Sequence, residues 1–307
     1  MIKHFIDLNQ IPAKDLRDII NLAKDLKAEH KSGKKNNSLD GANIAMIFEK
    51  NSTRTRVSFE VAIKQLGGDA IVMNSKDTQL NKGETISDTA KVLSRMVDGI
   101  MIRANSHQTI TELAKHSNVP IINALSDFSH PCQIIASILT IEEHLGSIKG
   151  KKLAWFGDQN NVLNSYIHAA KAFEYELAIA SPNGNDFSSD QIKTAKDSGA
   201  NVTVTNKPSV AASNADVLIT DTWFSMGDVA ENDESLKKDK ISQMMPYQVN
   251  QSLMSQAKES AIFTHCLPAY RNYEVEDKVI DSNSSVAFDE AENRLHAQKA
   301  ILVWLYK

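Results

Sequence analysis

Short apolar runs alternate with longer amphipathic stretches along most of the chain. In the first half, runs with the length of β-strands occupy residues 42–48, 69–74, 98–103 and 119–123. Apolar residues at helical spacing fill the intervals, which predicts helices over residues 11–33, 53–66, 85–96 and 106–117. Strands that alternate with helices in this way predict a parallel sheet with helices on both faces.

A second series of the same kind occupies the second half of the chain. Its strands are predicted at residues 151–158, 176–181, 201–205, 216–221 and 261–265. Its helices are predicted at residues 161–173 and 188–200. The two series indicate an α/β fold of two doubly wound parallel-sheet lobes, joined by long helices near residues 131–150.

The boundary between the lobes is expected near residue 148, which gives a first domain over residues 1–147 and a second over 148–288. The remaining segment, 289–307, contains a helix that is apolar on one side. Such a helix must pack against another part of the chain, because its apolar side is costly to leave in water.

Composition and charge narrow the class of protein. The chain has 307 residues, of which 42% are hydrophobic and 23% charged, as in soluble globular proteins. The net charge is −4, and Lys and Arg are scattered rather than gathered in a stripe. A nucleic-acid partner is therefore not expected.

Neither a membrane-spanning segment nor an export signal is apparent in the sequence. The first residues, MIKHFIDLNQ, lack the apolar run of a signal peptide, and no stretch approaches 18 consecutive apolar residues. Cys132 and Cys266 do not form a CxxC pair, which argues against zinc and against a redox dithiol. We therefore expect a cytoplasmic protein with reduced thiols and no membrane partner.

Unusual polar clusters follow six of the predicted strands. They are EKNSTRTR, Arg103, SDFSHPCQ, GDQNN, DTWFSMGD and HCLPAYR. In open parallel sheets, ligands bind at the carboxyl ends of the strands. The six clusters are therefore expected to face one crevice, with Asp221 across the crevice from Cys266.

The cluster STRTR, residues 52–56, opens a predicted helix directly after a strand. Free N–H groups and the helix dipole make such a helix end an anion site, and hydroxyls and a guanidinium add further donors. Residues two apart on a helix point to nearly opposite sides, so Arg54 is predicted to face the anion. Arg56 is predicted to pair with Glu60 on the scaffold.

STRTR, HPCQ and HCLPAYR, in this order, resemble the motifs of the aspartate/ornithine carbamoyltransferase family, and DTWFSMGD with HCLP resembles its ornithine branch. The resemblance runs from about FIDL to RLHAQKAIL. It implies transfer of the carbamoyl group from carbamoyl phosphate to the δ-amine of L-ornithine, which gives L-citrulline and phosphate. It also implies a role in arginine metabolism, either arginine biosynthesis or breakdown, since both directions use one site. It further implies no metal or organic cofactor, a homotrimer with sites at subunit interfaces, and a C-terminal helix that packs back on the first lobe.

The same resemblance assigns residues to carbamoyl phosphate. The phosphate and the carbamoyl group would be bound by Ser52, Thr53, Arg54, Thr55, Gln79, Arg103, His130, Gln133, Cys266, Leu267 and Arg294. Gln79 would reach the site of a neighbouring subunit. Arg103, His130 and Cys266 would be catalytic. Cys132 is interpreted as a packing thiol.

Ornithine is assigned to the second lobe. By resemblance, its amino-acid end would be bound by Asn161, Asp221, Ser225 and Met226, with Asn160 as the alternative to Asn161. Cys266 would contact the side-chain nitrogen. The segment 223–245 is expected to be a mobile polar loop that closes over the substrate. Tyr270 and Asn272 depart from the usual H-C-L-P-A-H-R-G, which alters the outer part of that turn.

Two other functions remain open from the sequence. A non-catalytic, two-lobed binding protein for an anionic small molecule would share the fold, although Cys266 and the missing signal peptide weaken this alternative. A sister transferase could instead use putrescine, lysine or aspartate. Asp221 with the SMG segment favours an α-amino acid over a diamine, and HCLP disfavours aspartate.

Overall fold

The computed structural model describes residues 2–74, 83–182, 190–224 and 233–307, and it divides into two compact units. The first unit consists of Met1–Leu139, Asn160–Ser165 and Glu292–Lys307. The second consists of Thr140–Gln159 and Tyr166–Ala291. Three helices run from one unit into the other, namely α5 (Pro131–Leu145), α6 (Asn161–Phe173) and α13 (Ala287–Tyr306). The predicted α/β class with two parallel-sheet lobes is confirmed.

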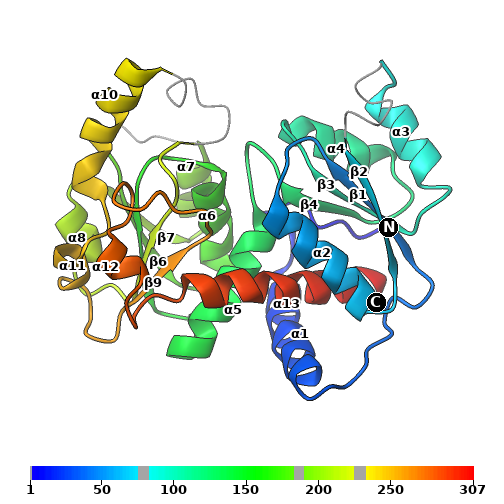
Figure 1. Cartoon of the computed structure of the whole chain (residues 1–307), viewed down its shortest axis with the longest axis horizontal. Helices are drawn as coiled ribbons and strands as arrows, with labels where there is room; N and C mark the ends of the chain where they lie inside the picture. Colours follow the sequence, from blue (N-terminus) through cyan, green and yellow to red (C-terminus); the bar gives the residue numbers. More distant parts are fainter. Residues whose placement is uncertain (1, 75–82, 183–189, 225–232) are drawn as a thin grey trace. The chain divides into compact units, whose positions relative to one another are not determined.

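The first unit is built on a parallel sheet with strand order β2-β1-β3-β4 (Figure 1). Its strands are β1 (Asn43–Phe48), β2 (Asp69–Asn74), β3 (Gly99–Arg103) and β4 (Ile121–Leu125). The apolar strands β1 and β3 are buried along nearly their whole length, as expected for central strands of a parallel sheet. The other elements of this unit are η1 (Leu8–Gln10), α1 (Ala13–Lys31), α2 (Thr53–Gln65), α3 (Ile86–Leu93) and α4 (His107–His116).

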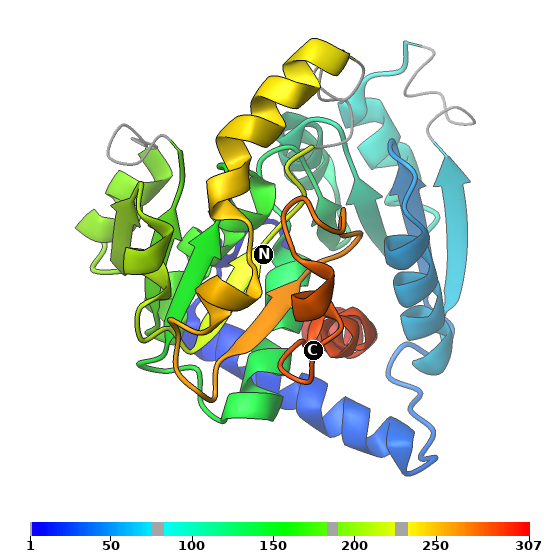
Figure 2. The same ribbon diagram turned by 60° about the vertical axis from the view of Figure 1, so that its left-hand side comes forward.

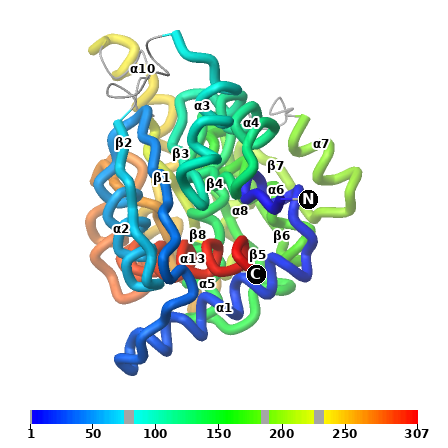
Figure 3. Tube along the Cα trace, turned by 90° about the vertical axis from the view of Figure 1, so that its right-hand side faces the viewer, coloured from blue at the N-terminus to red at the C-terminus, as the bar shows by residue number. Residues whose placement is uncertain are grey.

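Helix α13 packs within the first unit over its C-terminal part. The Trp304 ring meets Phe5 edge-on at a centroid distance of 6.4 Å, and buried Lys27 of α1 donates to Asn293 Oδ1 at 2.7 Å. Figure 3 shows α13, in red, beside α1, in blue. The predicted docking of the C-terminal helix on the first lobe is confirmed.

The second unit holds a parallel sheet with strand order β7-β6-β5-β8-β9, and β9, in orange, lies at one edge (Figure 2). The strands are β5 (Lys152–Phe156), β6 (Glu176–Ala180), β7 (Asn201–Thr205), β8 (Val217–Thr220) and β9 (Ile262–His265). Phe156, Leu218 and Phe263 from three of these strands share one core with Val275 and Ile280. The remaining elements are α7 (Asp190–Asp197), α8 (Pro208–Ala212), α10 (Glu234–Met244), η5 (Met245–Tyr247), α11 (Gln251–Met254) and α12 (Asp277–Ile280).

The sequence prediction missed the helices α8, α10, α11 and α12, and it misplaced the ends of several other elements. The segment 223–245, expected to be a loop, contains helix α10, whose cap Asp233 accepts from the N–H groups of Ser235 and Leu236. Met244 is the one buried residue of α10, so the helix lacks the apolar stripe that a pattern search detects. Strand β4 begins at Ile121, two residues later than predicted, directly after Pro120.

None of the helices in the described part of the chain combines the length and the apolar character needed to cross a bilayer.

Candidate functional site

Each sheet has one point where the chain order reverses direction, and ligands of open α/β sheets bind at such points. In the first unit this point lies between β1 and β3, where Phe48 and Arg103 are directly paired at the carboxyl ends. In the second unit it lies between β5 and β8, where Phe156 pairs with Thr220. The site residues predicted from the sequence are therefore expected near the carboxyl ends of these two pairs of strands.

Helix α2 begins after the carboxyl end of β1, and its first turn contains the exposed Thr53, the half-buried Arg54 and the buried Thr55. Ser52 is the N-cap, because its hydroxyl accepts from the Thr55 N–H at 3.2 Å. The buried Thr55 hydroxyl accepts from Ser52 at 3.0 Å and from the Arg294 guanidinium at 2.7 Å. Arg294 of α13 is itself buried, so this bond connects the C-terminal helix to the STRTR segment.

The two arginines of STRTR have different surroundings. Arg56 lies 3.6 Å from the Glu60 carboxylate, so the predicted i,i+4 pair is confirmed. Arg54 is half-buried, and the structure gives it no ion pair with any described residue. A half-buried guanidinium at a helix N-terminus, with no counter-ion among the residues that the structure describes, makes this position strongly electropositive.

Arg103 lies at the last position of β3, where the sheet is irregular. Ile102 pairs with Asn123 but Arg103 pairs with Leu125, so β4 bulges by one residue at this point. Bulges are common beside active sites because they redirect a side chain. The Arg103 side chain is buried, and its carbonyl accepts from the Glu49 N–H at 2.9 Å, which fixes the strand end.

His130 precedes the first residue of α5 and is held by its backbone. Its N–H donates to the Ser165 hydroxyl at 2.7 Å, and its side chain is 4% exposed. Burial lowers the pKa of His130 well below 6.5, and the positive charges of Arg294 and Arg103 lower it further. The ring is therefore neutral near pH 7, and its Nδ1 has no hydrogen-bond partner among the described residues.

The lowered pKa of His130 makes a prediction about stability. In the unfolded chain this histidine titrates near pH 6.5, whereas in the folded protein it stays neutral to lower pH. The unfolded state therefore binds the extra proton first. The free energy of unfolding should therefore not depend on His130 above pH 6.5. Below pH 6.5, the contribution of His130 should lower it by about 1.4 kcal/mol per pH unit.

Urea denaturation at pH 7.5, 6.0 and 5.0 would measure this effect in the wild type and in His130→Gln. We expect the stability of the variant to fall less steeply between pH 6.5 and 5, by about one proton. Equal slopes for the two proteins would contradict the neutral, buried state of His130.

The first turn of α5 carries two further predicted residues. Gln133 is buried beside His130, whose carbonyl accepts from the Gln133 N–H at 3.1 Å. The Cys132 thiol donates to the Asn123 carbonyl at 3.3 Å, and burial raises its pKa to about 12. Cys132 is thus a packing thiol, as predicted.

Asn160 and Asn161 differ in what their side chains do. The Asn160 carboxamide oxygen accepts from the N–H groups of Val162 and Leu163 and so caps α6. The Asn161 amide donates to the Ser126 carbonyl at 2.7 Å. Asn161 therefore lies against the loop that leads to His130, whereas Asn160 has a local structural task.

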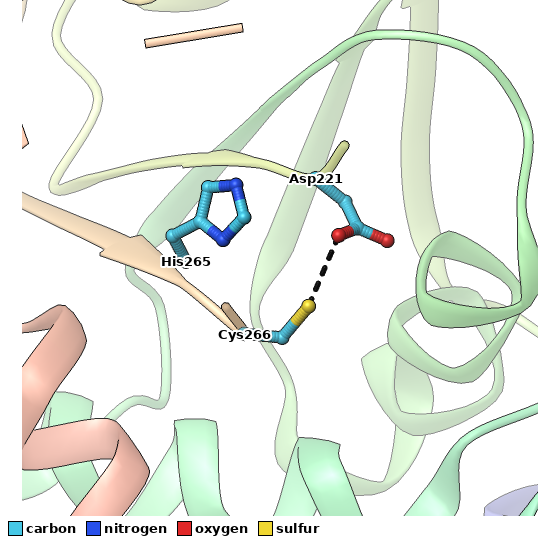
Figure 4. A group of neighbouring side chains, drawn as sticks. All are labelled: Asp221, His265 and Cys266. Carbon is cyan, nitrogen blue, oxygen red and sulfur yellow. Dashed lines mark hydrogen bonds between the residues drawn. The ribbon is translucent and has the colours of Figure 1, made fainter. Parts of the chain in front are cut away.

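The second unit brings Asp221 and Cys266 together at the ends of the adjacent strands β8 and β9. The Cys266 thiol donates to Asp221 Oδ1 at 3.0 Å (Figure 4). The expectation that Asp221 lies across a crevice from Cys266 is wrong, because Thr220 and His265 are directly paired in one sheet. This pairing places the carboxylate and the thiol of the next residues side by side.

His265 completes the only group in the described residues whose spacing suits a metal ion, since its ligand atoms lie within 4.8 Å of those of Asp221 and Cys266. However, His265 Nδ1 accepts from the Leu267 N–H at 2.8 Å, and Nε2 faces Glu274 at 3.3 Å. Both ring nitrogens are therefore engaged. Two available ligands fit a tetrahedral zinc site poorly.

Glu274 adjoins His265 and was not predicted from the sequence. This glutamate is fully buried, and its carboxylate contacts His265 and accepts from the Tyr270 N–H at 2.5 Å. Leu267, which lies within this turn, has a backbone φ of +56°, a value that a non-glycine residue rarely adopts without support. The motif EVED offers no sign of this burial, because Glu274 stands among exposed or half-buried acidic neighbours.

Three predicted residues, Gln79, Ser225 and Met226, lie outside the described residues. The first unit brings together Thr55, Arg103, His130 and Arg294, with Ser52, Thr53 and Arg54 on the same helix end and Gln133 on α5. The second unit brings together Asp221 and Cys266, with Leu267 next in the chain.

Comparison with known proteins agrees with this division. A family model described as "Aspartate/ornithine carbamoyltransferase, carbamoyl-P binding domain" matches residues 3–143, and one described as "Aspartate/ornithine carbamoyltransferase, Asp/Orn binding domain" matches residues 149–305. The chain is 53% identical over 303 residues to an ornithine carbamoyltransferase of Brucella abortus, a match that covers 99% of this chain and 95% of the relative.

A relative of the same name from Rhodopseudomonas palustris is 51% identical over 306 residues, which covers 99% of this chain and 96% of the relative. Among solved structures, the ornithine carbamoyltransferase from Pyrococcus furiosus superposes with a TM-score of 0.91 at 47% identity. That match covers 98% of this chain and 96% of the other.

Proposed function

Because the chain belongs to the aspartate/ornithine carbamoyltransferase family, we propose that it transfers the carbamoyl group of carbamoyl phosphate to the δ-amine of L-ornithine, which gives L-citrulline and phosphate. The observation that carries this proposal is the hydrogen bond from Arg294 to Thr55, beside a neutral His130. It ties two distant parts of the first unit into one electropositive site. Relatives named for ornithine, at half identity over nearly the full length, favour ornithine as the acceptor.

The first unit would bind carbamoyl phosphate. In our proposal the phosphate occupies the N-terminus of α2, with donors from the backbone and from Ser52, Thr53, Arg54 and Thr55. Arg103 would reach both the phosphate and the carbonyl oxygen. Arg294 would contact the carbamoyl group, and the Gln133 side chain and the Leu267 carbonyl would hold its NH₂. We assign this domain to residues 1–147 and 289–307, and the ornithine domain to 148–288.

His130 would act as a hydrogen-bond donor and not as a base. Attack by the amine moves negative charge onto the carbonyl oxygen of carbamoyl phosphate, and a tetrahedral intermediate forms. A neutral imidazole can donate one N–H to this oxygen. Burial keeps the ring neutral, and the guanidinium groups of Arg294 and Arg103, which lower its pKa further, add positive charge nearby. Collapse of the intermediate breaks the C–O bond to phosphate. The departing phosphate would take the proton that the attacking nitrogen loses, and Arg54 would stabilise the remaining charge.

Ornithine would be bound by the second unit together with Asn161. The Asp221 carboxylate suits a substrate ammonium, and Ser225 and Met226 would complete the contacts to the α-amino and α-carboxyl groups. The Cys266 sulfur would contact the δ-nitrogen and favour its unprotonated form. Asn161 is preferred over Asn160, because the carboxamide oxygen of Asn160 is occupied in capping α6.

We further propose a cytoplasmic homotrimer that serves arginine biosynthesis, with Gln79 reaching the site of a neighbouring subunit. Val57, Ile71, Val92 and Met96 of the first unit are exposed, and a subunit interface that covered them would remove apolar surface from water. Sedimentation equilibrium would decide the assembly state.

The function is tested by incubating the purified protein with carbamoyl phosphate and a panel of amines, and by measuring carbamoylated product and phosphate. We expect citrulline from ornithine, and at least 100-fold lower rates with putrescine, lysine and aspartate. A preference for another amine would make the chain a sister transferase. Saturable binding of carbamoyl phosphate without any product would instead support a binding protein.

A further inference from the structure

The N-terminal segment of the chain is attached to β4 and carries a buried carboxylate. Phe5 donates to the Ile121 carbonyl and accepts from the Asn123 N–H, both at 2.8 Å. Asp7 follows at the N-cap of η1, a position where an aspartate side chain normally bonds the helix end. It makes no such bond, and its Oδ2 lies 3.1 Å from His107 Nε2.

His107, the first residue of α4, contacts the turn that leads to His130. Its Nδ1 lies 2.9 Å from the Ser126 hydroxyl, and its backbone N–H donates to Asp127 Oδ1 at 2.7 Å. Its ring also lies 5.0 Å from the Phe128 ring, between centroids. One histidine thus touches three successive residues of this turn.

The hydrogen bonds have a definite direction. The Ser126 hydroxyl oxygen accepts from the N–H groups of Phe128 and Ser129, at 3.3 and 3.1 Å. With both lone pairs in use, the hydroxyl must donate its own proton, and His107 Nδ1 at 2.9 Å is a closer acceptor than the Ser129 carbonyl at 3.4 Å. Nδ1 then accepts, so the ring carries its proton on Nε2 and donates it to Asp7.

Although the order Asp, His, Ser resembles a hydrolase triad, Ser126 is no nucleophile here. Its side chain is fully buried, and its oxygen is already occupied by two backbone donors. The Ser126 carbonyl accepts from the Asn161 amide at 2.7 Å. The chain of bonds therefore fixes the turn 126–129 from one side, while the proposed substrate residues His130 and Asn161 adjoin it.

We propose that Asp7 and His107 are positioning residues for carbamoyl transfer, which hold the turn 126–129 so that the His130 ring meets the carbonyl oxygen as its charge develops. This inference rests on the proposed function. Because His130 would act on the transition state, loosening the turn should lower kcat and spare the binding of carbamoyl phosphate.

Steady-state kinetics of His107→Ala test the inference well below the unfolding temperature of the variant. We expect kcat to fall about tenfold, with KM for carbamoyl phosphate within twofold of the wild type. His116→Ala is the matched control, because His116 pairs with Glu112 at 2.8 Å at the other end of α4. It should leave kcat unchanged.

Two further measurements separate positioning from a general loss of structure. If His107 acts through His130, the double variant His107→Ala/His130→Gln should be no slower than His130→Gln alone. Asp7→Asn keeps an acceptor for His107 and should retain at least half of kcat, whereas Asp7→Ala should match His107→Ala. If His107→Ala does not fold, the comparison of Asp7→Asn with Asp7→Ala tests the same inference.

The outcomes separate the two proposals. An inactive wild type would refute the proposed function itself. If the wild type is active, two results would overturn the positioning role and leave the proposed function intact. One is a kcat of His107→Ala equal to that of His116→Ala. The other is a loss of kcat in His107→Ala/His130→Gln equal to the product of the losses in the two single variants.

Discussion

Arg54→Gln is expected to lower kcat for citrulline formation by about 10²–10³ while the protein stays folded. The Arg54 guanidinium is half-buried at the N-terminus of α2, and no described residue forms an ion pair with it. Its proposed partner is the phosphate, which gains charge as the C–O bond breaks. Glutamine forms helices well, so the scaffold should survive. Initial rates at saturating substrates, with circular dichroism as a check on folding, measure the effect.

Arg56→Gln is the matched control for this prediction, two residues away on the same helix. Arg56 pairs with Glu60 at 3.6 Å, and both side chains are about half exposed. Such exposed pairs contribute about 0.3–0.5 kcal/mol, so the control should stay within twofold of wild-type turnover. Near wild-type kcat in Arg54→Gln, or equal losses in both variants, would refute the role of Arg54.

Asp221→Asn is expected to lower kcat/KM for ornithine by roughly 10- to 150-fold, because a hydrogen bond to a charged group contributes about 1.5–3 kcal/mol. Asp221 is buried at the end of β8, where its carboxylate accepts from the Cys266 thiol at 3.0 Å. Asparagine has the same shape but cannot attract the substrate ammonium as strongly. KM for carbamoyl phosphate should stay within twofold.

Asp216 provides the control at the opposite end of the same strand. This buried carboxylate accepts from Lys258 at 2.8 Å and from the Lys152 N–H at 2.9 Å. Asp216→Asn should therefore lower the melting temperature and leave kcat/KM for ornithine nearly unchanged. If Asp216→Asn impaired ornithine use as much as Asp221→Asn, the effect would be one of general stability.

The fold followed closely from the sequence where burial imposes a pattern. Central strands such as β1 and β3 are apolar throughout because they are buried, and the turns between them carry the polar clusters. Helix α10 escaped detection because a single residue of it, Met244, is buried. The start of β4 was missed by two residues, which is the usual uncertainty for an element end next to a proline.

Only those features of the candidate site that depend on residues close together in the sequence could be predicted. STRTR predicted the Arg56–Glu60 pair, which the structure contains, and an anion site, which stays a prediction, because both depend on helix geometry alone. The bond between Arg294 and Thr55 joins residues 239 positions apart, and no local pattern encodes it. The adjacency of Asp221 and Cys266 likewise depends on which strands pair.

The long-range polar networks were the least predictable features. Asp7 contacts His107, which lies far away in the sequence. Glu274 contacts His265, which lies nearby in the sequence, across a turn. In the sequence these carboxylates look like any solvated charge. Their burial follows from the docking of whole elements, which single-residue chemistry does not reveal.

Calorimetric titration of carbamoyl phosphate, or of its stable analogue phosphonoacetamide, in the absence of ornithine measures whether the N-terminus of α2 binds the phosphate. We expect Arg54→Gln to weaken binding at least tenfold, whereas Asp221→Asn should bind within twofold of the wild type. Undiminished affinity in Arg54→Gln would contradict the assignment of the N-terminus of α2 to the phosphate, and with it the proposed site.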